Sequence, residues 1–311
     1  MDMGASNIPV TVVMRSYNDA ALLPRTLAAL DAQQGVEVTL FVYESASSDA
    51  SKEIFEEHGY DYIRHLAPGE YRSSKVLNDG AGRSRDELVA YVNSDAIMTE
   101  RMTLRRMADA ILADDRTCGA FARQTVRADA GPMTRVDYHV AFENRQELGE
   151  PAASWMSLVC SMLRRSALVA NPFDETLTFA EDAVWSQGMI DRGWRTVYVR
   201  GAVAEHSHNY TWEERYRRTY GDAAALARIL RHAPDRSYLS GFLIPYLKRC
   251  LRDLPRLAEV GRLAAFYQIP LYRWPLMLAN FRGTRDGWDF FNRETEEEGK
   301  ELLQPVIARP E

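Results

Sequence analysis

Apolar runs and helix-like segments alternate through the first 126 residues of the chain, and this alternation restricts the fold more than any other sequence feature. Short apolar runs bounded by polar turns are typical of buried strands, and the amphipathic segments between them are typical of crossover helices. The pattern therefore predicts an α/β fold with a largely parallel sheet. Strands are expected at Val10–Met14, Val38–Tyr43, Tyr60–Ile63, Leu88–Val92 and Thr117–Val126, and helices near residues 22–33, 48–57, 75–84 and 100–113.

The second half of the chain has a different pattern. Gly131–Met133 is expected to form a turn, and two short strands are expected around Thr196 and Val203. Beyond these strands helical signals dominate, although several prolines interrupt them. We therefore expect an α/β domain over residues 1–212 and a helical C-terminal extension over residues 213–311.

Positive charge is concentrated near the end of the chain, whereas the whole chain has a net charge of −6. Between Ser240 and Arg285 there are eight Lys or Arg residues and two acids, so this segment carries +6 and the remainder carries −12. Such a profile argues against a nucleic-acid partner. Two interpretations of the basic helices stay open. They either cap the first domain or form a dimer face, or they contact an anionic membrane surface.

Several features indicate the compartment. The sequence has no apolar run of about 18 residues that could span a bilayer, and its N-terminus has no signal-peptide pattern. Its three cysteines, Cys118, Cys160 and Cys250, are far apart and odd in number, which argues against a disulfide framework or a zinc site. We expect a cytoplasmic protein, which would be peripheral at the inner face of the membrane if the basic helices bind lipid.

Polar side chains follow three of the first four expected strands. Arg15-Ser16-Tyr17-Asn18 follows the first, Glu44 to Asp49 the second, and Asn93-Ser94-Asp95 the fourth. Because the carboxyl ends of neighbouring parallel strands meet in one crevice, these segments should lie close together. The first strand is not followed by G-x-G-x-x-G, and the chain has no G-x-x-x-x-G-K-[ST], which argues against a dinucleotide enzyme and a P-loop NTPase.

Acids in such a crevice can hold a divalent cation. Mg²⁺ and Mn²⁺ take one or two carboxylates together with phosphates and waters, and Asp95 is the best candidate ligand. The alternative is that Asp95 caps the helix that begins near Thr99. Glu44 and Asp49 have a similar alternative as turn and cap residues, although a Glu at a strand end gains nothing from capping.

Two histidines follow the last expected strand, in the run Glu205-His206-Ser207-His208. Residues two apart in an extended chain point to the same side, so His206 and His208 can both face the crevice. A satisfied structural histidine is the common alternative. Next to a metal and a diphosphate, we expect at least one of the two to be a ligand.

An acid pair, Glu181-Asp182, stands ahead of an amphipathic helix that Gly193 closes before the strand Arg195–Val199. A carboxylate at such a joint faces the end of the sheet and can act as a general base on a bound hydroxyl. The alternative is an N-cap favoured by the helix dipole. Trp185, one turn later, is expected in the core rather than stacked on a sugar.

Together these motifs resemble the inverting glycosyltransferases of family 2, which have the GT-A fold, a Rossmann-like mixed sheet flanked by helices. The resemblance covers about two thirds of the chain, from Val10 to about Tyr210. The matching motifs, in chain order, are Ser16-Tyr17-Asn18, Glu44 to Asp49, Asn78-Asp79-Gly80, Asn93-Ser94-Asp95, Arg164-Arg165, Phe173-Asp174-Glu175 and Glu181-Asp182.

Two later runs look like the bacterial rhamnosyltransferases of that family, which build surface polysaccharides from dTDP-L-rhamnose. They are His-Ser-His-x-Tyr at residues 206–210 and Pro-Leu-Tyr-Arg at residues 270–273, with Gly283 beyond. The chain departs from the family pattern at Glu44 and Asn93, where the family has Asp. The first change alters how the nucleotide base is held. The second leaves Asp95 as the dominant ligand in its motif, although an Asn can still hydrogen-bond a ribose or sugar hydroxyl.

The resemblance implies transfer of a sugar, with L-rhamnose favoured, from a dTDP-, UDP- or GDP-sugar to a glycan or lipid-linked glycan. Asp182 would be the general base with Glu181 beside it, and Mg²⁺ or Mn²⁺ would be held by Asp95, His206 and His208. The expected donor-binding residues are Ser16, Tyr17, Asn18, Glu44, Arg72, Lys75, Asn78, Asn93 and Ser94.

Other interpretations stay open. Arg72 and Lys75 can equally belong to a solvated loop and the start of a helix. A non-catalytic nucleotide-sugar-binding module of the same fold is compatible with Glu44 and Asn93, but the intact acid pair opposes it. A nucleotidyltransferase normally has a basic Gly-rich loop after the first strand, which this sequence lacks.

Overall fold

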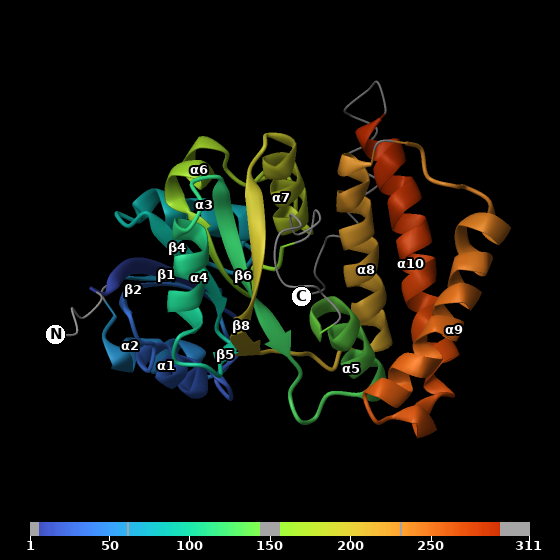
Figure 1. The fold of residues 1–311 in the computed structure, drawn as a ribbon, viewed down its shortest axis with the longest axis horizontal. Helices are drawn as coiled ribbons and strands as arrows, with labels where there is room; N and C mark the ends of the chain where they lie inside the picture. Colours follow the sequence, from blue (N-terminus) through green and yellow to red (C-terminus); the bar gives the residue numbers. More distant parts are fainter. Residues whose placement is uncertain (1–5, 61, 144–155, 231, 293–311) are drawn as a thin grey trace. The chain divides into compact units, whose positions relative to one another are not determined.

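A computed structural model of the chain describes residues 6–60, 62–143, 156–230 and 232–292 (Figure 1). Its contacts divide the chain into two compact units. The first unit consists of Met1–Arg127, Arg145–Glu175 and Trp185–His206, and the second of Ala128–Asn144, Thr176–Val184 and Ser207–Glu311. The chain therefore passes between the two units more than once.

The first unit is built on a mixed eight-stranded sheet with the order β3-β2-β1-β4-β7-β6-β8-β5. β1 is parallel to both β2 and β4, β7 is antiparallel to β4 and β6, and β8 is parallel to β6. The strands are β1 Ile8–Ser16, β2 Val36–Glu44, β3 Tyr62–His65, β4 Leu88–Asn93, β5 Ile97–Met98, β6 Thr117–Thr125, β7 Cys160–Arg164 and β8 Arg195–Glu205.

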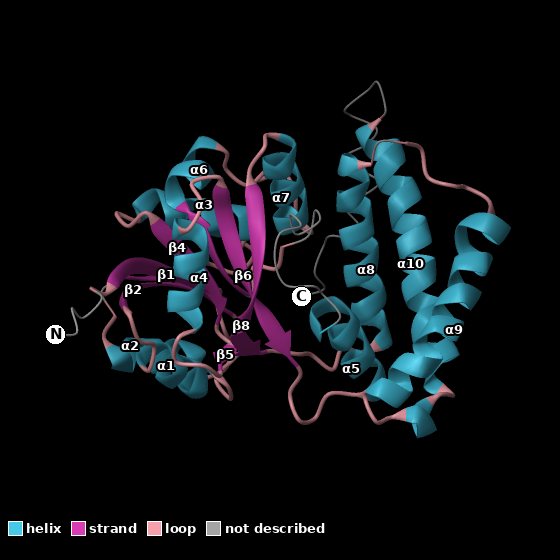
Figure 2. Ribbon diagram, in the orientation of Figure 1, coloured by secondary structure: helices cyan, strands magenta, loops and turns pink. Residues whose placement is uncertain are grey.

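Helices cover both faces of this sheet (Figure 2). Alternate residues of β1 point to opposite faces, so Val12 joins a core with helices α1 Leu23–Asp31, α2 Ser51–His58 and α4 Thr103–Leu112. Val13 points to the other face and packs against Gly80 of α3 Ser73–Arg83, where an added Cβ would lie 2.6 Å from Val13 Cγ2. Two further helices, α6 Arg165–Ala170 and α7 Glu181–Asp191, follow β7 and precede β8.

The structure confirms the α/β fold and the helical C-terminal part but corrects two local predictions. The two short strands expected around Thr196 and Val203 are one strand, β8. Its pairing with β6 shifts between Ala122, which faces Val199, and Arg123, which faces Val203, and this irregularity breaks the alternation of the sequence. The turn expected at Gly131–Met133 is the start of a helix, because proline is favoured at the first helical position.

The second unit is helical in its described residues. Its elements are α5 Pro132–Tyr138, η1 His139–Glu143, α8 Trp212–Leu226, η2 Ala227–Ile229, η3 Tyr238–Leu243, α9 Ile244–Glu259, η4 Leu263–Ala265 and α10 Gln268–Phe291. Helix α8 begins with a capping box, in which Glu214 N donates to Thr211 Oγ1 at 3.3 Å and Thr211 N donates to Glu214 Oε2 at 2.8 Å. Among the described helices none combines the length and apolar character needed to cross a membrane.

Helices α8 and α10 pack with their backbones in contact. A Cβ added at Gly283 would lie 2.4 Å from Tyr220 O, and one at Gly287 would lie 2.2 Å from Ala224 O. Both distances are shorter than any real carbon–oxygen contact, so only glycine fits at these two positions of α10. The two glycines are one helical turn apart and therefore lie on one face of α10.

A buried ionic cluster joins α5, α9 and α10. Asp253 is completely buried and accepts a hydrogen bond from Arg273 Nε, while Arg273 Nη2 donates to Asp137. Arg256 Nη1 donates to Asp253 Oδ1 at 3.3 Å, and Tyr272 Oη donates to Asp137 Oδ2 at 2.9 Å. Burial would lower the pKa of Arg273, but the two acids outweigh burial and raise it. The charged Arg273 of α10 thus links Asp137 of α5 to Asp253 of α9 and fixes the three helices to one another.

Candidate functional site

The carboxyl ends of β1, β2 and β4 meet at one edge of the sheet, as the sequence predicted. In the parallel register Ser16 is opposite Glu44, and Arg15 is opposite Asn93. We call these strand ends and the loops that follow them the carboxyl edge. Ligands of open α/β sheets bind outside this edge.

The loops after β1 and β2 are bonded to each other. Asn18 N donates to Ser47 Oγ at 3.0 Å, and Asn18 Oδ1 accepts from Ser48 N at 2.7 Å. Asn18 has a φ of 55°, a left-handed conformation that Asn tolerates better than most residues. Asp49 accepts hydrogen bonds from Ala20 N and Ser51 N. These contacts agree with the alternative interpretation of Asp49 as a turn and cap residue.

Glu44 is buried at the end of β2 and is already hydrogen-bonded. Its Oε1 accepts from Ser47 N at 2.6 Å, and its Oε2 lies 3.3 Å from His65 Nδ1. Burial alone would raise the pKa of Glu44, but the hydrogen bonds from Ser47 and His65 outweigh burial and lower it. Glu44 therefore stays ionised and holds the loop after β2 in place. Nearby, Ser16 Oγ is buried and has no hydrogen-bond partner among the described residues, while Tyr17 is half exposed.

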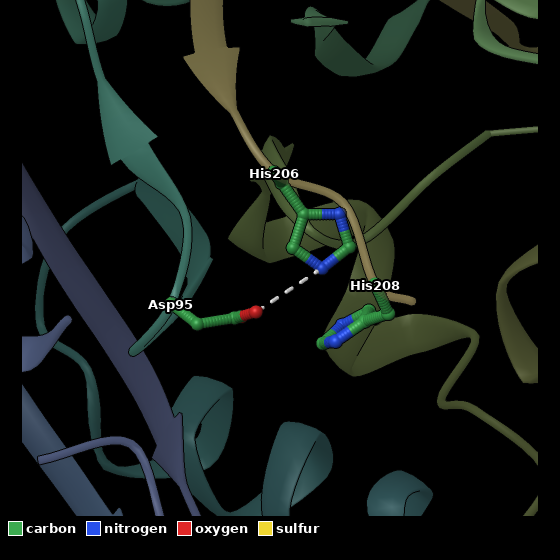
Figure 3. Close-up of side chains that lie close together, drawn as sticks. All are labelled: Asp95, His206 and His208. Atoms are coloured by element: carbon green, nitrogen blue, oxygen red, sulfur yellow. Dashed lines mark ion pairs between the residues drawn. The ribbon is translucent and has the colours of Figure 1, made fainter. Parts of the chain in front are cut away.

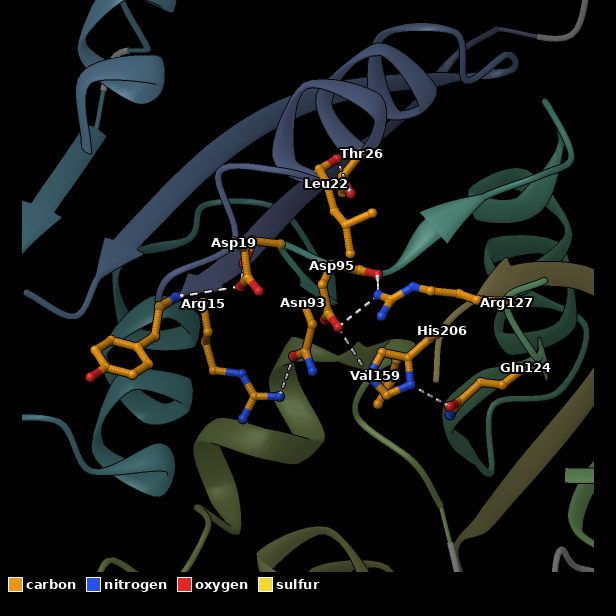
Figure 4. A network of polar contacts seen from close by, with 12 residues as sticks. Arg15, Asp19, Leu22, Thr26, Asn93, Asp95, Gln124, Arg127, Val159 and His206 are labelled. Atoms are coloured by element: carbon orange, nitrogen blue, oxygen red, sulfur yellow. Dashed lines mark hydrogen bonds and ion pairs between the residues drawn. The ribbon is translucent and has the colours of Figure 1, made fainter. Parts of the chain in front are cut away.

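Asn93 bonds to Arg15 (Figure 4), and Ser94 bonds to Asp19, which the sequence did not single out. Arg15 Nη2 donates to Asn93 Oδ1 at 2.7 Å, and Arg15 Nη1 donates to Ser73 Oγ at 2.7 Å, which ties the end of β4 to the start of α3. Ser94 Oγ donates to Asp19 Oδ2. Asn93 occupies the position that an acid takes in the family motif, and its amide oxygen is bonded to the positive guanidinium of Arg15.

Asp19 is a second acid near Asp95. Burial raises the pKa of Asp19, the hydrogen bond from Ser94 opposes this effect, and the charges of Asp95 and Asp49 raise the pKa further. The carboxyl edge therefore keeps like charges close together, an arrangement that is stabilised when a cation or a positive ligand group binds.

Asp95, His206 and His208 form a cluster suited to a metal ion (Figure 3). One ligand atom from each residue lies within 4.8 Å of the others, and His206 Nε2 lies 3.6 Å from Asp95 Oδ2. Asp95 and His206 are buried, and His208 is partly exposed. Arg127 Nη2 also donates to Asp95, to the backbone oxygen at 2.7 Å and to Oδ2 at 2.9 Å.

A hydrogen-bond chain sets the orientation of His206. Its Nδ1 lies 3.1 Å from Gln124 Oε1, and Gln124 Nε2 donates to Ser157 Oγ at 2.7 Å. Because the amide oxygen only accepts, we assign the hydrogen to Nδ1, which leaves Nε2 of the neutral ring as the nitrogen that faces Asp95. Histidine ligands of metals commonly donate their second N–H in this way.

The cluster fits a divalent cation chemically. It offers one hard carboxylate oxygen and two imidazole nitrogens, and diphosphate oxygens of a donor would supply further hard ligands. Both histidines lie in the cluster with Asp95, although the spacing in the sequence led us to expect only that at least one of them is a ligand.

The predicted residues of α3 divide into two groups. Asn78 Oδ1 accepts from Phe173 N at 3.0 Å, and Asn78 Nδ2 donates to Phe173 O at 2.9 Å and to Glu175 Oε1 at 3.1 Å. Asn78 therefore fastens the Phe-Asp-Glu motif to α3. Arg72, which directly precedes this helix, and Lys75 in its first turn are both exposed.

Glu181 and Asp182 form the first turn of α7, whereas the sequence placed them just ahead of this helix. Ala180 before them has a φ of 52°, and Ala183 N donates to Asp182 Oδ1 at 2.8 Å. Both acids are partly buried. Trp185 belongs to the core, where its Nε1 donates to Asn171 O at 2.6 Å and its ring lies 5.3 Å from that of Phe173. The prediction of a core tryptophan is confirmed.

Three residues of the site were missed in the sequence, and Arg15 was named only as part of the polar end of the first strand. Asp19 directly follows a recognised motif, so its position was a usable signal. Gln124 and Arg127 gave no signal of their own. They reach His206 and Asp95 because β6 and β8 are parallel neighbours, which places Gln124 opposite Ala204.

A comparison with protein families finds that the model of glycosyl transferase family 2 matches residues 11–170. Two curated relatives are O-antigen chain rhamnosyltransferases. RfbN of Salmonella typhimurium is 24% identical over 221 residues, which cover 68% of this chain and 70% of that protein. WbaN of Salmonella anatum is 23% identical over the same length, with the same coverage.

Solved structures with a similar fold are glycosyltransferases of GT-A type. The mannosyltransferase PcManGT from Pyrobaculum calidifontis, in complex with GDP-Man and Mn²⁺, has a TM-score of 0.54 and 17% identity, with 98% of this chain and 84% of that chain covered. S. aureus TarS 1-349, in complex with UDP-GlcNAc, has a TM-score of 0.51 and 16% identity, with 91% of each chain covered. At such identities the likeness establishes the fold, and it confirms the predicted GT-A architecture.

Proposed function

This chain belongs to glycosyl transferase family 2, and from that premise we propose that it transfers L-rhamnose from a dTDP-sugar to a glycan or lipid-linked glycan acceptor. The observation that carries the proposal is the cluster of Asp95, His206 and His208 beside the carboxyl edge of a GT-A sheet. The choice of sugar follows the two rhamnosyltransferase relatives and the role in surface polysaccharide synthesis follows their O-antigen description.

Donor binding is proposed at the carboxyl edge. Loops that hold each other through Asn18, Ser47 and Ser48 provide a rigid floor for the nucleoside. Arg127 and Arg15 bring positive charge toward the acids of the edge, where a diphosphate would need it. The proposed donor-binding residues are Ser16, Tyr17, Asn18, Glu44, Arg72, Lys75, Asn78, Asn93 and Ser94.

Asp95, His206 and His208 would hold the divalent cation. We favour Mn²⁺ over Mg²⁺ because two of the three ligands are imidazoles, which suit the less hard ion better. When bound, the ion offsets the negative charge that develops on the departing nucleoside diphosphate. The Gln124 amide keeps Nε2 of His206 directed at the same point as Asp95.

Asp182 is the proposed general base. Its carboxylate takes the proton of the acceptor hydroxyl, and the acceptor oxygen forms a bond to the anomeric carbon. The bond from that carbon to the diphosphate oxygen breaks, and the electron pair leaves with the nucleoside diphosphate. Because this is a single displacement, the configuration at the anomeric carbon inverts. Glu181 lies beside Asp182 in the same helical turn and would position the acceptor.

Replacement of the base gives the sharpest test. Asp182→Asn should lower the rate of sugar transfer by about 1,000-fold, because a positioned general base contributes roughly 10²- to 10⁴-fold. Donor binding, measured by the rise in melting temperature with dTDP-L-rhamnose and Mn²⁺, should be retained. Asp191→Asn in the last turn of the same helix is the matched control and should transfer at the wild-type rate. Transfer by Asp182→Asn at the wild-type rate would remove Asp182 from this role.

A panel of nucleotides tests the donor. The melting temperature is measured with UDP, GDP, dTDP and CMP and their sugar conjugates, with and without Mn²⁺ or Mg²⁺. A ligand at 100 times its dissociation constant adds about 2.7 kcal/mol to the free energy of unfolding. A metal-dependent shift with dTDP-L-rhamnose alone supports the proposal. A shift with another sugar nucleotide reassigns the donor, and binding without any transfer or donor hydrolysis indicates a non-catalytic module.

A further inference from the structure

Large apolar side chains are exposed along α9, η4 and α10 of the second unit. On α9, Leu247 is 51% and Leu251 is 67% exposed, and on α10 Leu271 is 74% exposed. The connecting segment continues the series with Leu263, Phe266 and Tyr267. Scattered exposed apolar residues need no explanation, but a continuous series on two consecutive helices marks an interaction surface. We call this surface the α9–α10 face.

Helical spacing places these residues in narrow stripes. On α9 the exposed residues Ile244, Leu247, Leu251 and Leu254 follow one another at intervals of three or four, so they lie along one side of the helix. On α10 Tyr267, Leu271 and Trp274 follow the same rule. The opposite side of α9 supplies Tyr246 and Leu257 to the interior. Helix α9 therefore packs one set of apolar side chains against the interior and leaves a second apolar stripe exposed.

Exposed positive charge accompanies the stripe. Lys248 and Arg252 lie one turn apart next to Leu247 and Leu251, and Arg262 stands before η4. The two acids of this region do not offset them. Asp253 is buried with Arg273, and Glu259 is the one exposed acid of this described segment, beside three exposed basic residues. The exposed part of this face is thus positive, although the whole chain carries −6.

The face is held in a fixed shape. The ionic cluster of Asp137, Asp253 and Arg273 joins α5, α9 and α10 beneath it. The ring of Trp274 lies 5.2 Å from Tyr246 and 4.9 Å from Phe242, so the tryptophan is anchored on one side and 43% exposed. Tyrosine and tryptophan with one wet and one apolar side are typical of membrane interfaces.

We propose that the α9–α10 face binds the surface of an anionic lipid bilayer. Amphipathic helices with an apolar stripe and adjacent Lys or Arg lie in the plane of the headgroups, and their binding combines apolar burial with attraction to anionic lipid. The occupant is a bilayer rather than a second copy of this chain, because a second copy would bring Lys248, Arg252 and Arg262 against the same positive residues. The inference does not depend on which sugar the enzyme transfers.

Vesicle flotation without sugar nucleotide tests the proposal on the full chain. The protein should float with vesicles that contain phosphatidylglycerol, should float poorly with pure phosphatidylcholine, and should detach as salt is raised. Lys248→Gln with Arg252→Gln should lower partitioning about 30-fold, because each basic residue near an anionic surface contributes about fivefold. Leu251→Ser with Leu271→Ser should lower it by about 100-fold.

The matched control is Leu112→Ser with Val169→Ser. It removes two exposed aliphatic side chains from the first unit and should leave flotation unchanged. Melting curves of all variants establish that each is folded. Absence of flotation of the wild type, or flotation that the face variants do not reduce, would overturn the proposal. A wild-type dimer that the face variants make monomeric, without vesicle binding, would overturn it in favour of a second copy. Sugar transfer to a soluble acceptor is measured separately, so its loss and the loss of lipid binding are distinguishable.

Discussion

Both units bury acidic side chains, but they surround them differently. In the second unit Asp253 is completely buried and receives hydrogen bonds from Arg256 and Arg273. At the carboxyl edge of the first unit Asp95 is paired with Arg127, but its charge also raises the pKa of the nearby acid Asp19. A buried acid that is fully paired with arginine holds helices together, whereas neighbouring acids with like charge mark a place where a cation is stabilised. The two clusters therefore separate a structural from a functional use of buried charge.

The largest expected effect breaks the structural cluster. Asp253→Asn leaves Arg273 buried with half of its acidic partners and should lower the free energy of unfolding by about 3–5 kcal/mol. Urea unfolding measures this loss. Metal-dependent binding of a nucleoside diphosphate at a temperature where the variant is folded should be retained. A loss below about 1 kcal/mol would contradict the structural role.

The matching change at the carboxyl edge should act on catalysis. Asp95→Asn removes a carboxylate from the metal cluster and should lower the transfer rate by about 10²- to 10³-fold, the effect typical for loss of one group that stabilises developing charge. The Mn²⁺-dependent rise in melting temperature with dTDP should also disappear. Asp109→Asn, at an exposed position on α4, is the control. A metal-dependent shift that survives in Asp95→Asn would place the ion elsewhere.

Asp222 on α8 is an acid of the second unit whose burial is only partly offset by a nearby arginine. Burial raises its pKa to about 6, Arg218 opposes this and Glu181 adds to it. Since the folded state holds the proton more tightly than the unfolded state, the free energy of unfolding should fall as pH rises from about 4 to about 6 and then level off.

Asp222→Asn should remove this pH dependence. The variant should match the wild type near pH 4 and be up to about 3 kcal/mol more stable above pH 6, which urea unfolding at a series of pH values measures. Parallel pH profiles for the two proteins would show that Asp222 does not carry the perturbed pKa.

The smallest expected effect concerns the support of His206. Gln124→Leu removes the acceptor of His206 Nδ1 and should weaken Mn²⁺ binding about 10- to 100-fold, the usual cost of losing a partner behind a metal ligand. Isothermal titration with Mn²⁺ measures the affinity. Gln124→Glu keeps an acceptor oxygen and should retain it. Equal weakening in both variants would mean that packing, and not the hydrogen bond, is responsible.

The elements that local pattern determines were predictable. The strands of the first half follow from apolar runs, and the meeting of Asn18, Glu44 and Asn93 follows from their places at the ends of parallel neighbours. The sequence also indicated that Asp95 belongs with His206 and His208, because an acid after one strand and two histidines after another suggested a shared ion.

What the sequence did not predict depends on contacts between distant segments. Arg127 acts on Asp95 through a pairing of β6 with β8 that no local pattern reveals. The irregularity of β8 between Val199 and Val203 made one strand look like two. The exposure of Leu251 and Leu271 could not be predicted either. An amphipathic helix has the same sequence pattern whether its apolar side is packed or exposed.

Gly283 and Gly287 have a mechanical consequence. Because the backbone of α8 fits into the space that these glycines leave on α10, α8 can neither slide nor turn along its partner without a steric clash. The chain enters α8 through the capped Thr211, and His208 stands three residues earlier, with its ring stacked 4.8 Å from that of Tyr210. His208 therefore stands shortly before a helix that is fixed against α10, so the segment that carries this proposed metal ligand leads directly into a rigid part of the second unit.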